Sequence, residues 1–164
     1  MRANKTEDEE ASTMICTYPK GRKKPEYPIL YNTEIMTGFE YALGGLMIAQ
    51  GFITKGENII KAVRARYDGE KRNPWSEIEC GSNYARSMAS YALLPIYSGF
   101  TFDMTKKYIG FDPIIKGDCR YFWSVGETCG EVVFEGKIQE VSVFENRFYL
   151  LLLVCEKENW LNRL

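Results

Sequence analysis

NPWSEIECGSNYARSMASYALL, residues 73–94, combines a loop-forming Asn-Pro, a tryptophan, two carboxylates, an arginine and the start of a helical pattern. The Asn-Pro pair predicts an irregular segment, from which Glu77 and Glu79 should project. Ser82 is a residue type that caps helices, so we expect a helix from about this position with Arg86 in its second turn. The run therefore predicts carboxylate and guanidinium groups that face one cavity.

Two helical patterns precede this run, at residues 37–51 and 54–69, and each ends at a glycine. Each also begins with the spacing of a capping box, Thr-x-x-Glu, in which side chains satisfy free N–H groups of the first turn. The apolar stripe of the first pattern and the apolar face of the second consist of Phe39, Leu43, Leu46 and Met47, and of Ile59, Ile60, Val63 and Tyr67. Both patterns are typical of amphipathic helices.

Gly44 and Gly45 lie inside the first of these patterns, where they lower helix propensity. A neighbouring element that approaches the backbone closely would explain them. The third helical pattern, from Ser82, has its apolar residues at Ala85, Met88, Ala89, Ala92 and Leu93. Pro95 should kink or stop that helix, because proline removes a backbone donor and clashes with the preceding turn.

The periodicity changes after residue 113, where short strand patterns alternate with glycine-containing turns. The expected strands are residues 119–125, 131–134, 138–144 and 147–154. At the other end of the chain, residues 1–28 are polar and contain an acidic and a basic run, which favours a loose N-terminal arm. We therefore divide the chain into an arm (1–28), a helical part (29–113) and a β-rich segment (114–164).

The composition excludes several classes of function. A net charge of −1, from 21 basic and 22 acidic residues, gives no long-range field for nucleic acid or an anionic membrane. The absence of histidine removes the commonest general base and a common metal ligand. No metal or cofactor motif is present, so we expect no cofactor.

Five cysteines without a CxxC spacing suit reduced thiols, so we expect a cytoplasmic protein. The first ten residues lack the apolar core of a signal peptide. The apolar run at residues 148–154 is too short for a transmembrane helix, which needs about 20 residues. Asp68, Asp103 and Asp112 lie in expected turns, where carboxylates usually accept from backbone donors.

Glu77, Glu79 and Arg86 are the best candidates for a binding site, because carboxylates and guanidinium groups recognise neutral polyols by charged hydrogen bonds. Trp75 and Tyr84 could add a stacking wall, although aromatic residues are more often part of a core. The structural alternative is that Glu77 or Glu79 pairs with Arg86 and fixes the loop to the helix. The residue types and their positions, taken by themselves, favour this structural ion pair.

The run also closely resembles glycoside hydrolase family 116, the retaining β-glucosidases that include non-lysosomal glucosylceramidase. The similarity extends to TGFEYALGGLMIAQG (37–51), IIKAVRARYDGEKRNPWSEIECG (59–81), YARSMASYALL (84–94), SGFTFDM (98–104), IGFDP (109–113) and RYFWSVGE (120–127). Roughly residues 34–145 are covered, and the matched segments correspond to the C-terminal part of the family's catalytic domain.

The resemblance implies a mainly α fold with a small β appendage: about three helices of an (α/α)6 barrel, followed by short C-terminal strands. It implies that Glu77 and Arg86 bind hydroxyls of the glucosyl unit, with Trp75, Glu79 and Tyr84 as pocket wall. The family's nucleophile and acid/base carboxylates lie upstream and are absent here. No residue of this chain is therefore expected to be catalytic.

We therefore expect a fragment of a retaining β-glucosidase that contributes a glucose-binding site and is inactive alone. The partner would be a β-glucoside or glucosyl lipid, and helix faces left uncovered are candidates for self-association. The alternative is a non-catalytic binding or scaffold module, or a nonfunctional remnant, in which Glu77 and Arg86 form a structural ion pair. We reject hydrolysis by Glu77 and Glu79 themselves, because neighbouring loop carboxylates cannot readily flank both sides of a sugar ring.

Overall fold

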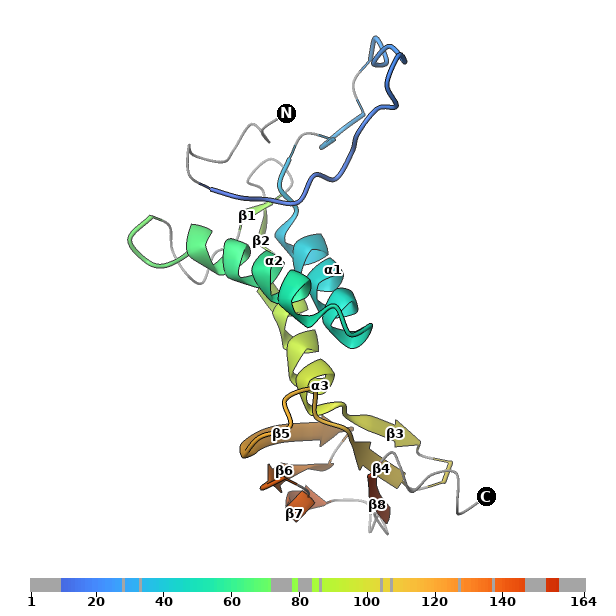
Figure 1. Ribbon diagram of the computed structural model, residues 1–164, viewed down its shortest axis with the longest axis vertical. Coiled ribbons are helices and arrows are strands. Elements are labelled where there is room, and N and C mark those ends of the chain that lie inside the picture. Colours follow the sequence, from blue (N-terminus) through green and yellow to red (C-terminus); the bar gives the residue numbers. More distant parts are fainter. Residues whose placement is uncertain are drawn as a thin grey trace. The chain divides into compact units, whose positions relative to one another are not determined.

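The chain forms two compact units, residues 1–92 and 93–164, in the computed structural model (Figure 1). The structure describes residues 10–27, 29–32, 34–71, 78–79, 84–85, 87–103, 105–106, 108–126, 128–136, 138–146 and 153–156. The first unit holds a pair of α-helices, a two-stranded ribbon and a 3-10 helix. The second holds one short α-helix and two three-stranded sheets.

The helix pair consists of α1 (Thr37–Ala49) and α2 (Ile53–Arg66), joined by a tight turn at Gly51 with φ of +85°. The two backbones approach so closely that a Cβ on Gly56 of α2 would collide with the carbonyl oxygen of Gly44 and lie 2.6 Å from Cγ1 of Ile48. A Cβ on Gly44 would lie 3.0 Å from Cγ1 of Ile60. The expected close approach at Gly44 is therefore confirmed.

The helix starts differ from the expected capping boxes. The N-cap residues are Met36 and Phe52, and neither makes a side-chain cap hydrogen bond. Glu40 instead pairs with Arg66 of the other helix, and Glu57 pairs with Lys61 at 3.2 Å. The prediction of capping boxes from the Thr-x-x-Glu spacing is therefore wrong, because both glutamate side chains pair with basic side chains instead.

The two faces of α1 are also reversed relative to the usual amphipathic pattern. Its buried residues are small or polar for the most part: Thr37, Gly38, Glu40, Tyr41, Gly44, Gly45 and Ile48. Phe39 and Leu46, which belong to the apolar stripe, are 57% and 58% exposed. Glycines let α2 pack directly on the backbone, so the bulky stripe is left facing outward. In α2, by contrast, Val63 and the adjoining Tyr67 are buried, as their pattern predicts.

The helix expected from Ser82 is present only in part. Residues 84–85 are extended, and the helical stretch begins with the 3-10 helix η1 (Ser87–Ala92), which is followed by α3 (Leu93–Ser98). Pro95 does not stop this helix. It lies in the first turn of α3, where a helix has free N–H groups in any case and proline is tolerated.

The second unit contains two sheets. In one, β3 (Thr101–Asp103) pairs antiparallel with β4 (Tyr108–Phe111), and β4 pairs parallel with β8 (Leu153–Glu156). In the other, β6 (Thr128–Phe134) lies between β5 (Cys119–Val125) and β7 (Ile138–Asn146), antiparallel to both. Gly126 and Gly136, at φ of +54° and +72°, lie in the turns between these strands. The strand expected at 119–125 is confirmed with those bounds.

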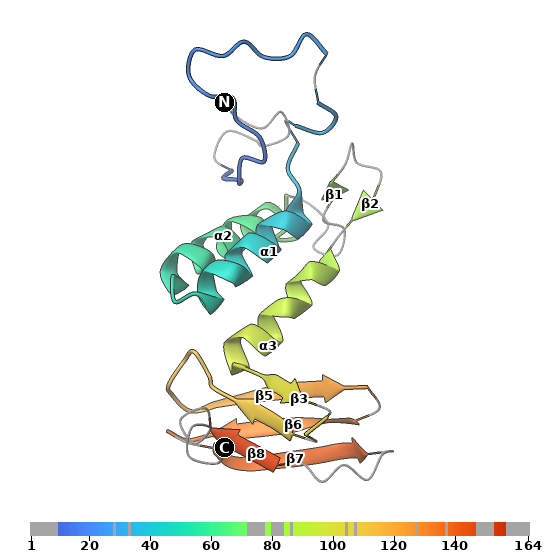
Figure 2. The same cartoon turned by 90° about the vertical axis from the view of Figure 1, so that its right-hand side faces the viewer.

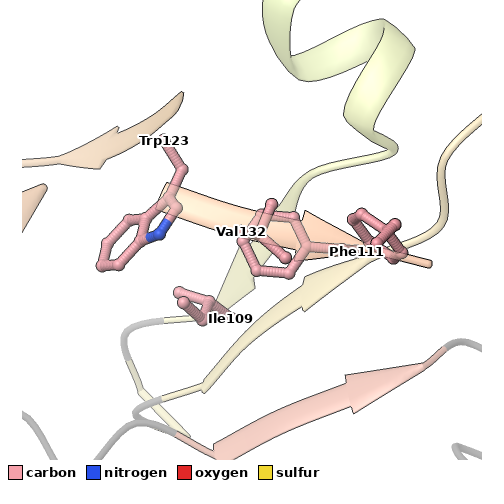
Figure 3. Packing of buried hydrophobic residues seen from close by; sticks show 5 residues of the cluster. Ile109, Phe111, Trp123 and Val132 are labelled. Atoms are coloured by element: carbon pink, nitrogen blue, oxygen red, sulfur yellow. The ribbon is translucent and has the colours of Figure 1, made fainter. Parts of the chain in front are cut away.

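The core of the second unit lies between the two sheets. β4 contributes Ile109 and Phe111, and the other sheet contributes Trp123, Val132 and Phe134, all at most 5% exposed (Figure 3). Phe111 and Phe134 meet edge to face, with ring centroids 6.4 Å apart. Alternate residues of β6 are buried, as the period of a strand with one covered face requires. This arrangement joins sheet to sheet through aromatic contacts.

Two of the three turn aspartates satisfy backbone donors as expected. Asp68 accepts from the N–H groups of Glu70 and Lys71, at 3.0 Å each. Asp103 accepts from the hydroxyl of Thr105 at 2.6 Å and from backbone N–H groups, and these hydrogen bonds lower the pKa of its carboxyl group. They are structural turn residues.

The prediction of a mainly α fold with a partial (α/α)6 barrel is wrong. The fold is α+β: strands β3 and β4 lie within the range 29–113 that was expected to be helical, and two sheets build the second unit. The error has a physical origin, since Tyr108–Phe111 is buried along its whole length. Strands of that kind lack the alternation of apolar and polar residues that identifies a half-buried strand.

Candidate functional site

A short β-ribbon occupies the position of the sequence-derived site. β1 (Ile78–Glu79) pairs antiparallel with β2 (Tyr84–Ala85), with Ile78 opposite Ala85 and Glu79 opposite Tyr84. The side chains of Glu79 and Tyr84 lie outside the described part of the structure, as do the residues Trp75, Glu77 and Arg86. Residues 84–85 are extended, so the helix does not run continuously from Ser82 as expected, whereas the predicted position of Arg86 falls outside the described residues.

The ribbon lies beside the N-terminal turn of α1, where Figures 1 and 2 agree on its place. The same end of the helix pair holds Glu40 of α1 and Arg66 of α2, because the chain reverses direction between the two helices. A second candidate group, made of these two charged residues, therefore accompanies the ribbon within the first unit.

Glu40 and Arg66 form a salt bridge through Oε2 and Nη2, and their side chains are only 2% and 1% exposed. Each also binds the N-terminal arm. The backbone N–H of Thr13 donates to Oε1 of Glu40 at 2.7 Å, and Nη1 of Arg66 donates to the carbonyl oxygen of Ala11 at 2.6 Å. The arm, which its composition predicts to be loose, is thus anchored at residues 11–13.

This charged group is closed to solvent, so it has a structural role. Buried charges are tolerated when they are paired and when their remaining hydrogen-bonding capacity is used. Here Glu40 and Arg66 pair with each other and with the arm backbone, although Nε of Arg66 makes no hydrogen bond among the described residues. The group therefore positions the arm on the helix pair and does not serve as a general acid or base.

Sequence reasoning missed this pair, although a signal for it exists. Glu40, Gly44 and Ile48 follow one another at intervals of four, so they share a helix face with the residues that α2 contacts. Arg66 follows the buried Val63 by three positions in the same way. Charged residues at positions that share a face with close-packed glycines indicate a buried ion pair.

Two buried side-chain atoms of this unit have no hydrogen-bond partner among the described residues: Nε of Arg66 and Oγ1 of Thr37. Thr37 is fully buried in the first turn of α1.

The described residues hold no group of three His, Cys, Asp or Glu side chains that could bind a metal ion. Within the same residues, no helix is long and apolar enough to cross a membrane. No protein-family model matches this sequence, and no curated protein matches it either.

Proposed function

We propose that this chain is a glucose-binding part of a retaining β-glucosidase of the glucosylceramidase type. Glu77 and Arg86 would bind hydroxyl groups of the sugar, with Trp75, Glu79 and Tyr84 beside it. The proposal rests on the resemblance of residues 73–94 and their flanking segments to glycoside hydrolase family 116. It concerns the binding residues and does not depend on a barrel.

The register of the ribbon supports the proposal: Glu79 lies opposite Tyr84, and Ile78 lies opposite Ala85. Glu77 and Arg86 lie outside the described residues, but they are the next residues in the sequence before Ile78 and after Ala85, and we propose that they continue this pairing.

The alternation of side chains in a ribbon supports a common binding face. Residues two apart on one strand share a face, and so do residues directly opposite each other. In the proposed extension of the register, Glu77, Glu79, Tyr84 and Arg86 would therefore all lie on one face. Two carboxylates, a phenol ring and a guanidinium group are a suitable set for a neutral polyol, each charged hydrogen bond contributing about 1.5–3 kcal/mol.

The proposed site binds sugar but does not hydrolyse it. Retaining hydrolysis needs two carboxyl groups about 5–5.5 Å apart on opposite sides of the scissile bond. Glu77 and Glu79 would share a face of the ribbon, so they cannot flank a sugar ring from both sides. Turnover of a β-glucoside or glucosyl lipid would need the nucleophile and acid/base carboxylates of a parent enzyme or partner chain.

We also propose a cytoplasmic location. Cys16, Cys119 and Cys129 are free thiols, and persistent free thiols are typical of reducing compartments. The numbers of basic and acidic residues are nearly equal, which favours a protein without a nucleic-acid partner.

The same register favours one alternative function. Opposite charges at directly opposed positions of a ribbon attract each other, contributing about 0.2–1 kcal/mol. In a non-catalytic scaffold module, Glu77 and Arg86 would form this ion pair and bind no sugar.

Isothermal titration calorimetry of the full chain with glucose and with a glucose-type iminosugar tests the proposal. Glu77→Gln and Arg86→Ala should each weaken binding by about 10-fold or more, since each removes a charged hydrogen bond. The control variant is Glu70→Gln, which changes an exposed glutamate of the same unit. Absence of binding at millimolar ligand, with the helical circular dichroism intact, would leave the scaffold alternative.

A further inference from the structure

Part of the N-terminal arm forms a loop that is closed at its base. The side-chain amide of Asn32 donates to the phenol oxygen of Tyr18 at 2.9 Å, and so joins residues that are 14 positions apart. We call residues 18–27 and 29–32 the arm loop. In Figures 1 and 2 its blue trace projects away from the helix pair of the same unit.

Tight turns shape both halves of the arm loop. The backbone N–H of Arg22 donates to the carbonyl oxygen of Pro19 at 3.1 Å, in a turn where Gly21 has φ of +78°. In the other half, the backbone N–H of Asn32 donates to the carbonyl oxygen of Ile29 at 3.2 Å. The loop therefore has a preformed shape, so it loses less conformational entropy on binding a partner than an unstructured segment would.

The arm loop presents basic and apolar side chains to solvent together. Its basic residues are all exposed: Lys20, Arg22, Lys23 and Lys24. Only one acidic residue, Glu26, accompanies these four, which gives the segment a local net charge of +3. The large apolar residues of the loop are exposed as well: Tyr27 (83%), Ile29 (57%), Leu30 (80%) and Tyr31 (44%). Both kinds of side chain are therefore available to one partner.

This combination is complementary to an anionic lipid bilayer. Basic side chains bind acidic lipid headgroups, and neighbouring apolar side chains enter the boundary between headgroups and acyl chains. The chain as a whole has a net charge of −1 and no long-range attraction to such a surface. At contact, however, the charges within about one Debye length, roughly 8–10 Å, determine the attraction. We propose that the arm loop docks the chain on the surface of an anionic membrane.

The apolar residues of the loop favour a bilayer over a nucleic acid. Single-stranded nucleic acids bind basic grooves and stack their bases on aromatic rings, but they offer no apolar layer for Ile29 and Leu30. A bilayer offers that layer directly beneath its charged headgroups. The cytoplasmic leaflet carries the anionic lipids, which agrees with the proposed cytoplasmic location.

Sedimentation of the full chain with lipid vesicles tests the proposal. Vesicles of phosphatidylcholine with about 30% phosphatidylserine should bind the chain at least about 10-fold more tightly than pure phosphatidylcholine, because only the former carry net charge. Raising the salt concentration from about 50 to 500 mM should release the chain by screening that attraction. No binding to the anionic vesicles, or equal binding to both kinds, would overturn the proposal without the need for a variant.

A charge-reversed variant locates the binding surface. Arg22→Glu combined with Lys23→Glu should weaken binding at least about 10-fold, because each basic residue near an anionic surface strengthens binding roughly 5-fold. The matched control is Lys55→Glu combined with Lys106→Glu, which makes the same change of charge at exposed lysines outside the loop. Equal losses in the two double variants would show that total charge, and not the arm loop, determines binding.

Leu30→Ser tests the apolar contribution. It should weaken binding about 5-fold or more, since a leucine side chain would no longer enter the bilayer. Leu46→Ser is the control, because it makes the same change at an exposed position of α1. Leu30→Ser binding like the parent, or tighter binding of the parent to poly-uridine RNA than to anionic vesicles, would contradict a membrane partner. The arm loop shares no residue with the proposed sugar site, so vesicle sedimentation and calorimetry with glucose succeed or fail separately.

Discussion

Glu40 of α1 and Arg66 of α2 form a salt bridge in which both side chains are almost completely buried. The pair holds three parts of the first unit together: two helices and the arm segment around Ala11 and Thr13. Such a pair adds little stability relative to a well-packed apolar pair, but the loss of one partner leaves the other as an uncompensated buried charge. The pair is therefore a sensitive point of the unit.

Glu40→Gln should lower the free energy of unfolding by about 3–5 kcal/mol, because Arg66 would keep its charge and lose the buried carboxylate with which it pairs. The double variant Glu40→Leu with Arg66→Met should lose less than the single variant. Urea unfolding followed by circular dichroism at 222 nm measures both. A single variant within 1 kcal/mol of the parent would show that the charge of Arg66 is compensated elsewhere.

The close contact of the two helices gives a graded prediction. Gly56→Ala should be more destabilising than Gly44→Ala, because the Cβ at position 56 would collide with the carbonyl oxygen of Gly44, whereas the nearest atoms to a Cβ at position 44 are 3.0 and 3.1 Å away. We expect about 1–3 kcal/mol for Gly56→Ala, in spite of the better helix propensity of alanine.

Thermal unfolding followed by helical circular dichroism measures this order. Gly117→Ala is the control, since a Cβ at Gly117 meets nothing within 4 Å and φ is not in the left-handed region. Equal effects of the two helical substitutions would mean that the helices separate freely.

The glycines of α1 show which features of the helix packing can be predicted from the sequence. Gly44 predicts a close approach because glycine inside a helix has a cost that packing must offset. The position of the apolar stripe predicts the wrong buried face, because periodicity reports where bulky residues lie and not which face a neighbour selects. Small residues selected the face here, and the stripe was left outside.

The strands likewise divide into those that the sequence predicts and those that it does not. Residues 119–125 are rich in aromatic residues and are followed by Gly126, so the sequence predicts this strand and its end. β4 is buried at every position and β1 and β2 have two residues each, so neither periodicity nor length identifies them. The register that sets Glu79 opposite Tyr84 is likewise a property of the fold and not of residue spacing.

The core of the second unit contains an indole N–H that no described residue accepts, that of Trp123, which is 2% exposed. Trp123→Phe removes this donor and keeps an aromatic ring beside Phe100, whose ring lies 6.3 Å from the indole. An unsatisfied buried donor costs about 1–3 kcal/mol, so its removal should offset much of the lost packing.

We therefore expect Trp123→Phe to change the free energy of unfolding by less than about 1.5 kcal/mol, whereas Trp123→Ala should cost about 3–5 kcal/mol. Chemical unfolding monitored by far-ultraviolet circular dichroism separates the two. A phenylalanine variant as damaged as the alanine variant would indicate that the N–H has a partner in solution.

Alkaline pH should destabilise the second unit through Tyr121. Its partial burial, together with the hydrogen bond and the charge of Cys119, raises the pKa of the phenol to about 12. An unfolded tyrosine ionises near pH 10, so between pH 10 and 12 the unfolded chain loses a proton that the folded chain keeps. Stability is therefore unaffected by this group below pH 10 and falls as pH rises through that window.

Tyr121→Phe should lose less stability over the same range, which urea titrations at pH 9, 10, 11 and 12 would show. Parallel losses for parent and variant would mean that other tyrosines cause the alkaline unfolding.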